Sequence, residues 1–409
     1  MNKILVLYVG THRLSAILAE ITPEGAQILN HAELLDPEGF QAGEVAQIEK
    51  ALVSTGELIS RFELGEEATQ IPAYVLLSGP HLKMTPFSSS VYYSGYPRVI
   101  TTREVQQVIE QTRSVAPLSL EDRILQVAPE FFWVDDLTGV EDPIGLEARR
   151  LAVSLQIYST KYSVFRNLSR LFESLEMNLK GYFPKTLVIP KAVLSLTERE
   201  GEALVMDFSD GATHLILNRE GKIVRTSSLD LGSRFLTHKI AQTWNVGVRD
   251  AQRLKEQFGS LEENLQFREE LVPLVERNGQ SHHPIKREDF HKKFLGFADE
   301  LFTRLDQEIS GLLASEKMSV PTLVLTGGGV KLDGLLEFLS RRFSFPVRLG
   351  TPRQLGGSTG ALLDPAWAGP LGLLCHLGET WNERGPSRGK ENVVERALFQ
   401  FKEWFVAYF

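Results

Sequence analysis

The chain has 409 residues, of which 43% are hydrophobic and 23% are charged, and its formal net charge is −8. This composition predicts a globular protein with a buried core and room for two domains. The acidic balance argues against a general nucleic-acid binder, and a single cysteine, Cys375, excludes a disulfide framework or a cysteine-cluster zinc site. No stretch reaches the ~18–20 apolar residues of a membrane-spanning helix. The short apolar run at the start is better explained as a first strand than as a signal peptide, so we expect a protein that stays inside the cell.

Two similar openings, half a chain apart, organise the sequence. The apolar run Ile4–Val9 ends in Gly10-Thr11 and is followed by a second run, Leu14–Ile21. Much later, Ala203–Phe208 is followed in the same way, after a short loop, by His214–Leu217. The repetition predicts a duplicated α/β fold with a cleft between its halves.

Segments with helical spacing alternate with strand-like runs along the chain. The helical segments are Val45–Phe62, Thr102–Ser114, Lys161–Met177, Ser233–Trp244, Asp250–Phe258 and Arg287–Leu313. The further strand-like runs are Ala73–Leu77, Leu151–Tyr158, Thr186–Ile189, Thr322–Leu325 and Pro346–Arg348. Such alternation predicts a mainly parallel sheet with helices packed on it.

Two stretches depart from this rhythm. Residues from about Ser78 to Tyr158 hold their own helix and two strand candidates, Arg123–Asp135 and Ala148–Tyr158, which predicts a small inserted α+β subdomain. Residues Gly378 to Asn392 are rich in Gly, Pro, Ser and charged side chains, as in a flexible linker.

A glycine-rich loop follows the strand that ends at Leu325. It contains Gly327, Gly328 and Gly329, and we expect a helix to begin at about Leu332. Glycines allow close backbone approach to a ligand, and a helix N-terminus favours a phosphate or a ribose edge. Taken alone, the same pattern fits a tight strand-to-helix turn equally well.

In context, this loop resembles the nucleotide-base loop of FtsA-like proteins, a bacterial family of actin-like ATPases. Other segments match the family in the same order: Tyr74–His81, Ile100–Val105, Arg123–Pro129, Asp142–Leu146 and Leu194–Glu198. The resemblance implies an actin-like (ribonuclease H-like) α/β fold of two duplicated domains, with an inserted SHS2-type subdomain and a C-terminal amphipathic helix.

The resemblance also implies domain boundaries. Residues 1–78 and 159–198 form the first actin-like domain, 79–158 the inserted subdomain, 199–235 and 321–377 the second domain, 236–320 its lower lobe, 378–392 the linker and 393–409 a membrane helix.

ATP and Mg²⁺ are the cofactors that the family implies. Its nucleotide site is carried over onto Gly10, Thr11, Asp207, Gly211, Lys255, Gly327, Gly328 and Gly329. No catalytic residue and no direct metal ligand is predicted.

Several positions depart from the family pattern. The Asp that helps to hold the hydrated magnesium is Tyr8, and the Asp that closes the second phosphate loop is His214. Two glycines of that loop are Ser209 and Asp210, and a carboxylate there would repel phosphates if it faced them. We therefore expect no competent ATP hydrolysis, whereas weak nucleotide binding stays open.

The last 17 residues have one apolar half at helical spacing. Its members include Val394, Leu398, Phe401, Trp404, Phe405 and Tyr408. Such a helix lies in the headgroup region of a membrane, and it is similar to the family's membrane-targeting helix. The alternative is a last helix docked on its own domain or on a partner, because acidic residues cancel Arg396 and Lys402.

Family members capture the acidic–apolar C-terminal tail of the tubulin-like FtsZ on the lower lobe. The residues here that suit such a peptide are Lys286, Lys292, Lys293, Phe297 and Glu300. The family's Pro-Arg pair corresponds to Gly296-Phe297, so the arginine contact is lost or moved. The alternative is an ordinary solvated helix face.

The resemblance thus predicts a peripheral protein on the cytoplasmic face of the inner membrane, at the division site. It would tether FtsZ filaments to that membrane, recruit other divisome proteins and self-associate into filaments. One alternative is an assembly-platform protein like PilM, which shares the fold, binds a short partner peptide and lacks the terminal helix. Another is an active kinase-like enzyme, disfavoured because Tyr8 and His214 replace carboxylates.

Overall fold

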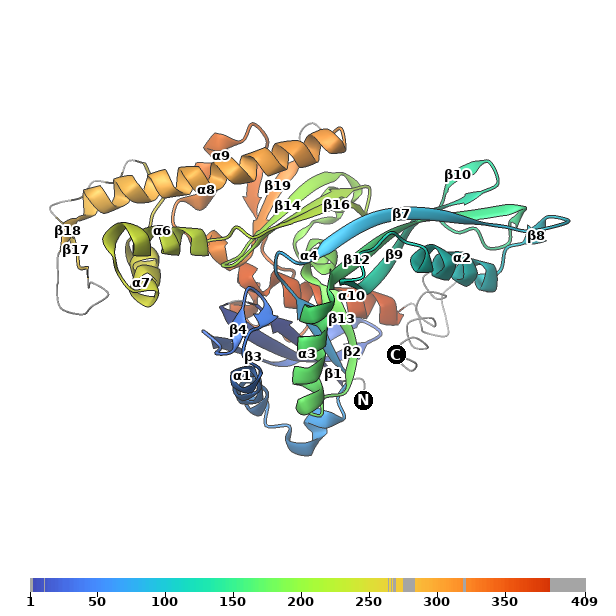
Figure 1. Cartoon of the computed structure of the whole chain (residues 1–409), viewed down its shortest axis with the longest axis horizontal. Helices are drawn as coiled ribbons and strands as arrows, with labels where there is room; N and C mark the ends of the chain where they lie inside the picture. Colours follow the sequence, from blue (N-terminus) through green and yellow to red (C-terminus); the bar gives the residue numbers. More distant parts are fainter. Residues whose placement is uncertain are drawn as a thin grey trace. The chain divides into compact units, whose positions relative to one another are not determined.

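The structure is a computed structural model that describes residues 3–10, 12–263, 265, 267, 270–274, 284–318 and 321–382. Contacts between residues divide the chain into two compact units, and Figure 1 labels most of their helices and strands. Unit 1 comprises residues 1–192, 353–361 and 369 onward, and unit 2 comprises 193–352 and 362–368.

Unit 1 is built on a five-stranded sheet in the order β13-β6-β1-β2-β3. The strands are β1 (Lys3–Val9), β2 (Arg13–Thr22), β3 (Gly25–Leu35), β6 (Ala73–Leu77) and β13 (Leu179–Pro184). Its helices are α1 (Ile48–Ser60), α3 (Tyr162–Ser174), α4 (Lys185–Val193) and α10 (Ala368–Asn382), and a small hairpin joins β4 (Phe40–Gln41) to β5 (Glu44–Val45). Alternate residues of β6 serve opposite faces: Val75 joins the core beneath α1 and α3, whereas Leu76 meets α10 at Gly369.

The inserted subdomain within unit 1 has a separate sheet in the order β10-β9-β12-β7. Its elements are β7 (Lys83–Tyr92), β8 (Arg98–Val99), α2 (Thr102–Ser114), β9 (Asp122–Val134), β10 (Leu137–Val140), β11 (Glu147–Ala148) and β12 (Arg150–Lys161). Helix α2 begins with a capping box between Thr101 and Glu104 and packs over β7 and β12. This layer encloses its own hydrophobic cluster.

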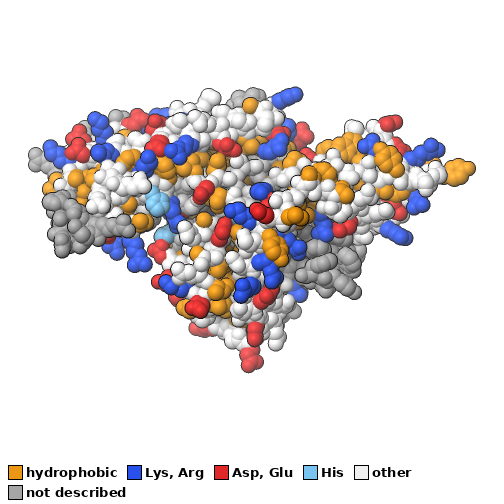
Figure 2. Space-filling model, viewed as in Figure 1, with side chains coloured by type: hydrophobic (Ala, Val, Ile, Leu, Met, Phe, Trp, Pro, Cys, Tyr) orange, Lys and Arg blue, Asp and Glu red, His pale blue; other side chains and the backbone are white. Residues whose placement is uncertain are grey.

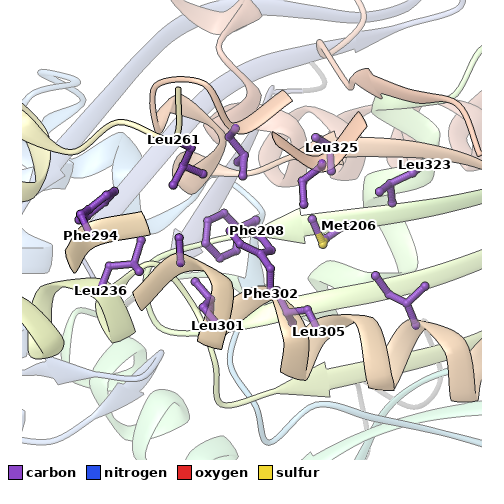
Figure 3. Close-up of a cluster of buried hydrophobic side chains, with 14 of the residues drawn as sticks. Met206, Phe208, Leu236, Leu261, Phe294, Leu301, Phe302, Leu305, Leu323 and Leu325 are labelled. Atoms are coloured by element: carbon purple, nitrogen blue, oxygen red, sulfur yellow. The ribbon is translucent and has the colours of Figure 1, made fainter. Parts of the chain in front are cut away.

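Unit 2 has a second five-stranded sheet, in the order β16-β15-β14-β19-β20. The strands are β14 (Glu202–Phe208), β15 (Thr213–Arg219), β16 (Lys222–Leu229), β19 (Thr322–Thr326) and β20 (Val347–Leu349). The helices are α5 (Leu196–Glu200), α6 (Arg234–Trp244), α7 (Val248–Phe258), α8 (Arg287–Ser315) and α9 (Leu335–Arg342), and short strands β17 (Leu271–Val272) and β18 (Ile285–Lys286) precede α8. The core lies where Phe208 of β14 meets Phe302 of α8 (Figure 3).

The two large sheets share one strand order, so the predicted duplication is confirmed. In each sheet the first strand pairs antiparallel with the second, and the second with the third, while the other pairs are parallel. The prediction of a mainly parallel sheet is therefore wrong, because the short turns between the first three strands of each unit force an antiparallel meander.

Three local predictions also differ from the structure. Thr186–Ile189, predicted as a strand, lies in α4, because a short apolar run does not distinguish a buried strand from a buried helix. The helix expected from Leu332 begins at Leu335, after a 3₁₀ turn over Gly328–Lys331 and a left-handed Gly334 with φ of 72°. Helix α10 extends to Asn382, so the predicted linker starts as helix.

Candidate functional site

The hairpin loop between β14 and β15 stands where the resemblance places the second phosphate loop of the family. It closes on itself, because the backbone N–H of Ser209 donates to the carbonyl oxygen of Ala212 at 3.1 Å. Asp207, at the end of β14, is fully buried, and its Oδ1 accepts a hydrogen bond from the Ser209 hydroxyl at 3.2 Å. Gly211 lies in the same loop and is partly exposed. Asp207 and Gly211 therefore belong to the same hairpin, Asp207 near the end of β14 and Gly211 in the loop that follows.

The glycine loop after β19 packs directly on this strand end. A Cβ at Gly327, where φ is 92°, would lie 2.6 Å from the Phe208 carbonyl oxygen and closer still to Asp207 Oδ1. A Cβ at Gly329 would lie 2.6 Å from Phe208 Cδ1, whereas at Gly328 the nearest atom would be 3.9 Å away. Packing on β14 therefore requires two of the three glycines, and only Gly328 has room above it.

Asp210, which stands at a family glycine position, is held by two cations of unit 2. Its Oδ2 accepts hydrogen bonds from Arg234 Nε at 2.9 Å and Arg234 Nη2 at 2.8 Å. Its Oδ1 lies 3.9 Å from the ammonium nitrogen of Lys255. The predicted nucleotide lysine thus faces a carboxylate of the protein itself.

Lys255 is only 6% exposed, and burial lowers the pKa of its ammonium group while the Asp210 carboxylate opposes that shift. The ammonium nitrogen also contacts the Ser233 hydroxyl at 3.2 Å and the Ser233 carbonyl oxygen at 3.3 Å. The Lys255 ammonium group therefore has polar partners from the protein itself: the Asp210 carboxylate and two oxygens of Ser233.

The corresponding loop of unit 1 is covered by Tyr8. The Gly10 N–H donates to the Arg13 carbonyl oxygen at 3.0 Å, and a Cβ at Gly10 would lie 2.8 Å from the Tyr8 hydroxyl. Tyr8 is 7% exposed, and the ammonium nitrogen of the buried Lys185 lies 5.2 Å from its ring centroid. Thr11 lies outside the described residues.

These arrangements do not fit magnesium-bound phosphate. Tyr8 places an aromatic ring where the resemblance assigns the carboxylate that helps to hold the hydrated ion. The carboxylate of Asp210 lies beside Lys255, the lysine that would meet a phosphate. Within the glycine loop, Gly328 is the position where an added Cβ would meet no atom closer than 3.9 Å.

His214 is a buried structural residue at the position of the family's second Asp. It pairs with Asp207 across β14 and β15, and its Nδ1 lies 2.9 Å from the Ser228 hydroxyl. Within the described part of the chain, no group of three or more His, Cys, Asp or Glu side chains is placed to hold a metal ion.

A basic–aromatic face lies where α6 and α8 pack together. The ring of Trp244 in α6 stacks on the ring of the buried Phe290, with 4.8 Å between their centroids. The ring of Phe297 meets the Trp244 ring edge-on, with 6.1 Å between their centroids. The ammonium nitrogen of Lys293 lies 6.0 Å from the Trp244 ring centroid. Trp244 of α6 and Lys293 and Phe297 of α8 thus form one surface, named here the α6–α8 face.

The same surface continues one helical turn further. The Glu300 carboxylate pairs with Lys239 at 2.6 Å and with Arg304 at 2.7 Å, and these partners lower its pKa. Both cations also lie over the ring of Phe235, at 5.1 and 5.2 Å. The helices in this region carry mixed charged and hydrophobic side chains at the surface (Figure 2).

The predicted partner-binding residues are therefore only partly brought together. Lys293, Phe297 and Glu300 share one face at helical spacing, whereas Lys292 projects about 100° away from that line. Lys286 is exposed in β18, just before α8. Sequence reasoning missed Lys239 and Trp244, because they lie about fifty residues earlier and only the α6–α8 packing makes them neighbours.

The membrane-directed residues Val394, Leu398, Phe401, Trp404, Phe405 and Tyr408 lie outside the described residues. Among the described helices, none has the length and apolar character needed to cross a membrane.

Comparison with protein families gives two matches. Residues 204–372 match the model of cell division protein FtsA, and residues 79–159 match the SHS2 domain inserted in FtsA. Cell division protein FtsA of Borreliella burgdorferi is 25% identical over 408 residues, which span 99% of this chain and 98% of that protein. Its counterpart from Escherichia coli strain K12 is 23% identical and covers 96% and 94% of the two chains.

Solved structures show the same fold at lower identity. A PilM–PilN type IV pilus biogenesis complex superposes with a TM-score of 0.64 at 18% identity, covering 92% of this chain and 98% of that one. MreB5 of Spiroplasma citri bound to AMPPNP gives a TM-score of 0.52 at 11% identity, with coverages of 91% and 95%. These likenesses establish the actin-like architecture.

Proposed function

From the premise that this chain is a distant member of the FtsA cell division protein family, with an SHS2 domain inserted in an actin-like fold, we propose that it is a cytoskeletal scaffold. It holds FtsZ filaments at the inner membrane and recruits other divisome proteins. Self-association into filaments is part of the same proposal, by analogy with the actin-like MamK double helical filament, whose fold it shares at a TM-score of 0.52.

The α6–α8 face carries this proposal. An acidic–apolar tail needs a hydrophobic surface for its apolar side chains and positive charge for its carboxylates. Trp244 and Phe297 supply the hydrophobic surface, and Lys293 supplies the positive charge, 6.0 Å from the Trp244 ring centroid. At the family's arginine position, Phe297 offers ring contact instead of a guanidinium, so Lys293, beside Trp244, supplies the positive charge in this proposal.

We further propose that ATP hydrolysis is impaired. MreB5 structures with this fold hold AMPPNP or ADP, but Tyr8 and His214 replace the carboxylates that the resemblance assigns to magnesium and to the second phosphate loop. Residual nucleotide binding would rest on the space at Gly328.

Membrane attachment is proposed for residues 393–409. The apolar half of that segment, which includes Trp404 and Phe405, suits insertion at the headgroup level of the inner membrane. The protein would then be peripheral on the cytoplasmic face at the division site. A PilM-like platform function is the second candidate, favoured by the TM-score of the PilM–PilN complex.

The tail-binding proposal is tested with a fluorescent peptide of the acidic–apolar FtsZ C-terminal tail, titrated with the full chain. Lys293→Glu is expected to weaken binding about tenfold, because it reverses the charge above Trp244. Lys317→Glu is the matched control, since it makes the same charge change at an exposed position just after the C-terminal end of α8. Equal affinities for the two variants would refute the role of this face.

Fluorescent fusions of the full chain and of a chain truncated after Glu391 separate the two candidate functions. Midcell bands that disappear on truncation support the membrane-tethered scaffold. Diffuse signal from both fusions would contradict it and favour the platform function.

A further inference from the structure

A buried cation in unit 2 already has an anion supplied by the chain. Lys255 is 6% exposed, and a buried ammonium group is costly unless an anion or strong hydrogen-bond acceptors surround it. Its nearest carboxylate oxygen is Asp210 Oδ1 at 3.9 Å, and Asp210 is the charge that most favours its protonated form. Arg234 binds the other oxygen of the same carboxylate, through two nitrogens at 2.8 and 2.9 Å.

The backbone fixes this carboxylate in place. The carbonyl oxygens of Ser209 and Asp210 accept hydrogen bonds from the N–H groups of Ser233 and Arg234, at 3.0 and 2.9 Å. Gly232 allows this approach, since a Cβ there would lie 2.5 Å from the Ser209 carbonyl oxygen. The loop is thus docked on the first turn of α6, and the Asp210 side chain extends from a defined position toward both cations.

We propose that Asp210 is the internal ligand of a built anion site, formed by Lys255, Arg234 and Ser233, and that this residue is what excludes phosphate groups from unit 2. A carboxylate and a phosphate present the same kind of negatively charged oxygen acceptors to lysine and arginine. Both cannot occupy the space beside Lys255, and a phosphate arriving there would meet a like charge. Removal of the carboxylate leaves a buried lysine and an arginine without their anion, which is a site for inorganic pyrophosphate or the phosphates of ATP.

This inference goes beyond the scaffold proposal and holds whether or not the chain binds a tail peptide or a membrane. The simpler explanation is an ion pair that only stabilises the loop. The two explanations differ in one respect: a purely structural pair leaves nothing to bind when it is broken, whereas a filled anion site gains affinity for an external anion.

The test measures pyrophosphate and ATP binding to the full chain by isothermal titration calorimetry, without added magnesium. Asp210→Asn keeps the size of the side chain and removes its charge, and Asp210→Gly places the family's residue there. Each is expected to bind pyrophosphate at least tenfold more tightly than the unmodified chain. Asp230→Asn, an exposed acid of the same unit, removes the same charge and is expected to change nothing.

Adding Lys255→Met to Asp210→Asn is expected to abolish the gain. The proposal is overturned if Asp210→Asn binds pyrophosphate no more tightly than Asp230→Asn does. It is also overturned if the unmodified chain binds ATP and loses that binding in Asp210→Asn, because the carboxylate would then support the ligand.

Urea unfolding with and without pyrophosphate covers the case of variants that fold poorly. A ligand that binds only the folded state raises the unfolding midpoint, so pyrophosphate should raise it for the Asp210 variants and leave that of the unmodified chain in place. A variant that pyrophosphate does not stabilise contradicts the proposal. Tail-peptide binding is measured on the same samples and reports on the α6–α8 face. A failure of the tail-binding proposal can therefore be told apart from a failure of the anion-site proposal.

Discussion

The ammonium nitrogen of Lys185 lies 5.2 Å from the centroid of the Tyr8 ring, and both side chains are almost completely buried. The negative face of an aromatic ring attracts a cation, and it does so more strongly away from water. In the FtsA-like family that the sequence resembles, the position of Tyr8 holds the Asp that helps to bind the hydrated magnesium. An aromatic ring therefore stands there over a buried cation, and it also covers Gly10.

Loss of the Tyr8 ring should destabilise unit 1. Tyr8→Ala is expected to lower the free energy of unfolding by about 3 kcal/mol, because it leaves a cavity beside an uncovered Lys185. Tyr8→Phe, which keeps the ring, should cost much less. Urea denaturation measures both, with Tyr96→Ala as the control, since Tyr96 is 88% exposed. Similar losses for Tyr8→Ala and Tyr96→Ala would contradict the packing role.

The three glycines after β19 should respond unequally to alanine. Gly327→Ala and Gly329→Ala are each expected to cost at least ~2 kcal/mol, because the added Cβ overlaps Asp207 or Phe208. Gly328→Ala should stay within about 0.5 kcal/mol of the unmodified chain. Thermal unfolding compares the three variants. Equal effects at all three positions would show that packing on β14 does not set the requirement.

Stability should depend on pH through Glu198. Hydrogen bonds from Arg348 and from Ser195 lower the pKa of its carboxyl group to about 2. A carboxyl group with a lowered folded-state pKa contributes stability above its ordinary pKa of 4.5, and that contribution disappears as the pH falls toward 2. With solvent screening, the contribution is about 1–2 kcal/mol.

Urea midpoints of the unmodified chain and of Glu198→Gln, measured at pH 7, 5 and 3, check this dependence. The difference between the two proteins should be largest at pH 7 and should shrink by pH 3. Glu337→Gln, an exposed residue of α9, is the control. A difference that stays constant over this range would mean that the ion pair with Arg348 does not set the pKa.

Tail-peptide affinity should fall as salt rises, since Lys293 is exposed and its attraction for carboxylates is screened. Between 50 and 300 mM salt, binding by the unmodified chain should weaken severalfold, whereas Lys293→Gln should show a flatter dependence. Peptide titrations across this range give the two slopes. Parallel slopes would place the interacting charge elsewhere.

Local sequence patterns predicted the helices and hairpins that are formed by contacts between residues close together in the sequence. Helix α2 was predicted at its observed bounds, and its Thr101–Glu104 capping box is a purely local signal. The repeated hairpins were visible because apolar strands and small-residue turns recur. The α4 segment was not, since its four-residue window, Thr186–Ile189, is too short to show a period.

The candidate site was predictable as a set of residue types but not as a set of partners. Asp210 was expected to repel phosphate, yet its binding to Arg234, 24 residues later, depends on how α6 docks against the loop. The glycine pattern fits both a ligand loop and a tight turn, and it does not reveal that Gly327 and Gly329 are required by Phe208 of a strand about 120 residues earlier. Contacts of this range arise only from the folded topology.

The shared strand order of the two sheets places the two hairpin loops at equivalent positions in their units. Unit 1 fills its loop with an aromatic ring over Lys185, and unit 2 fills its loop with a carboxylate beside Lys255. The two loops are occupied by different chemical groups, so a substitution that empties one loop leaves the other occupied. Opening a path for phosphate on both sides would therefore require substitutions in both units, at Tyr8 and at Asp210.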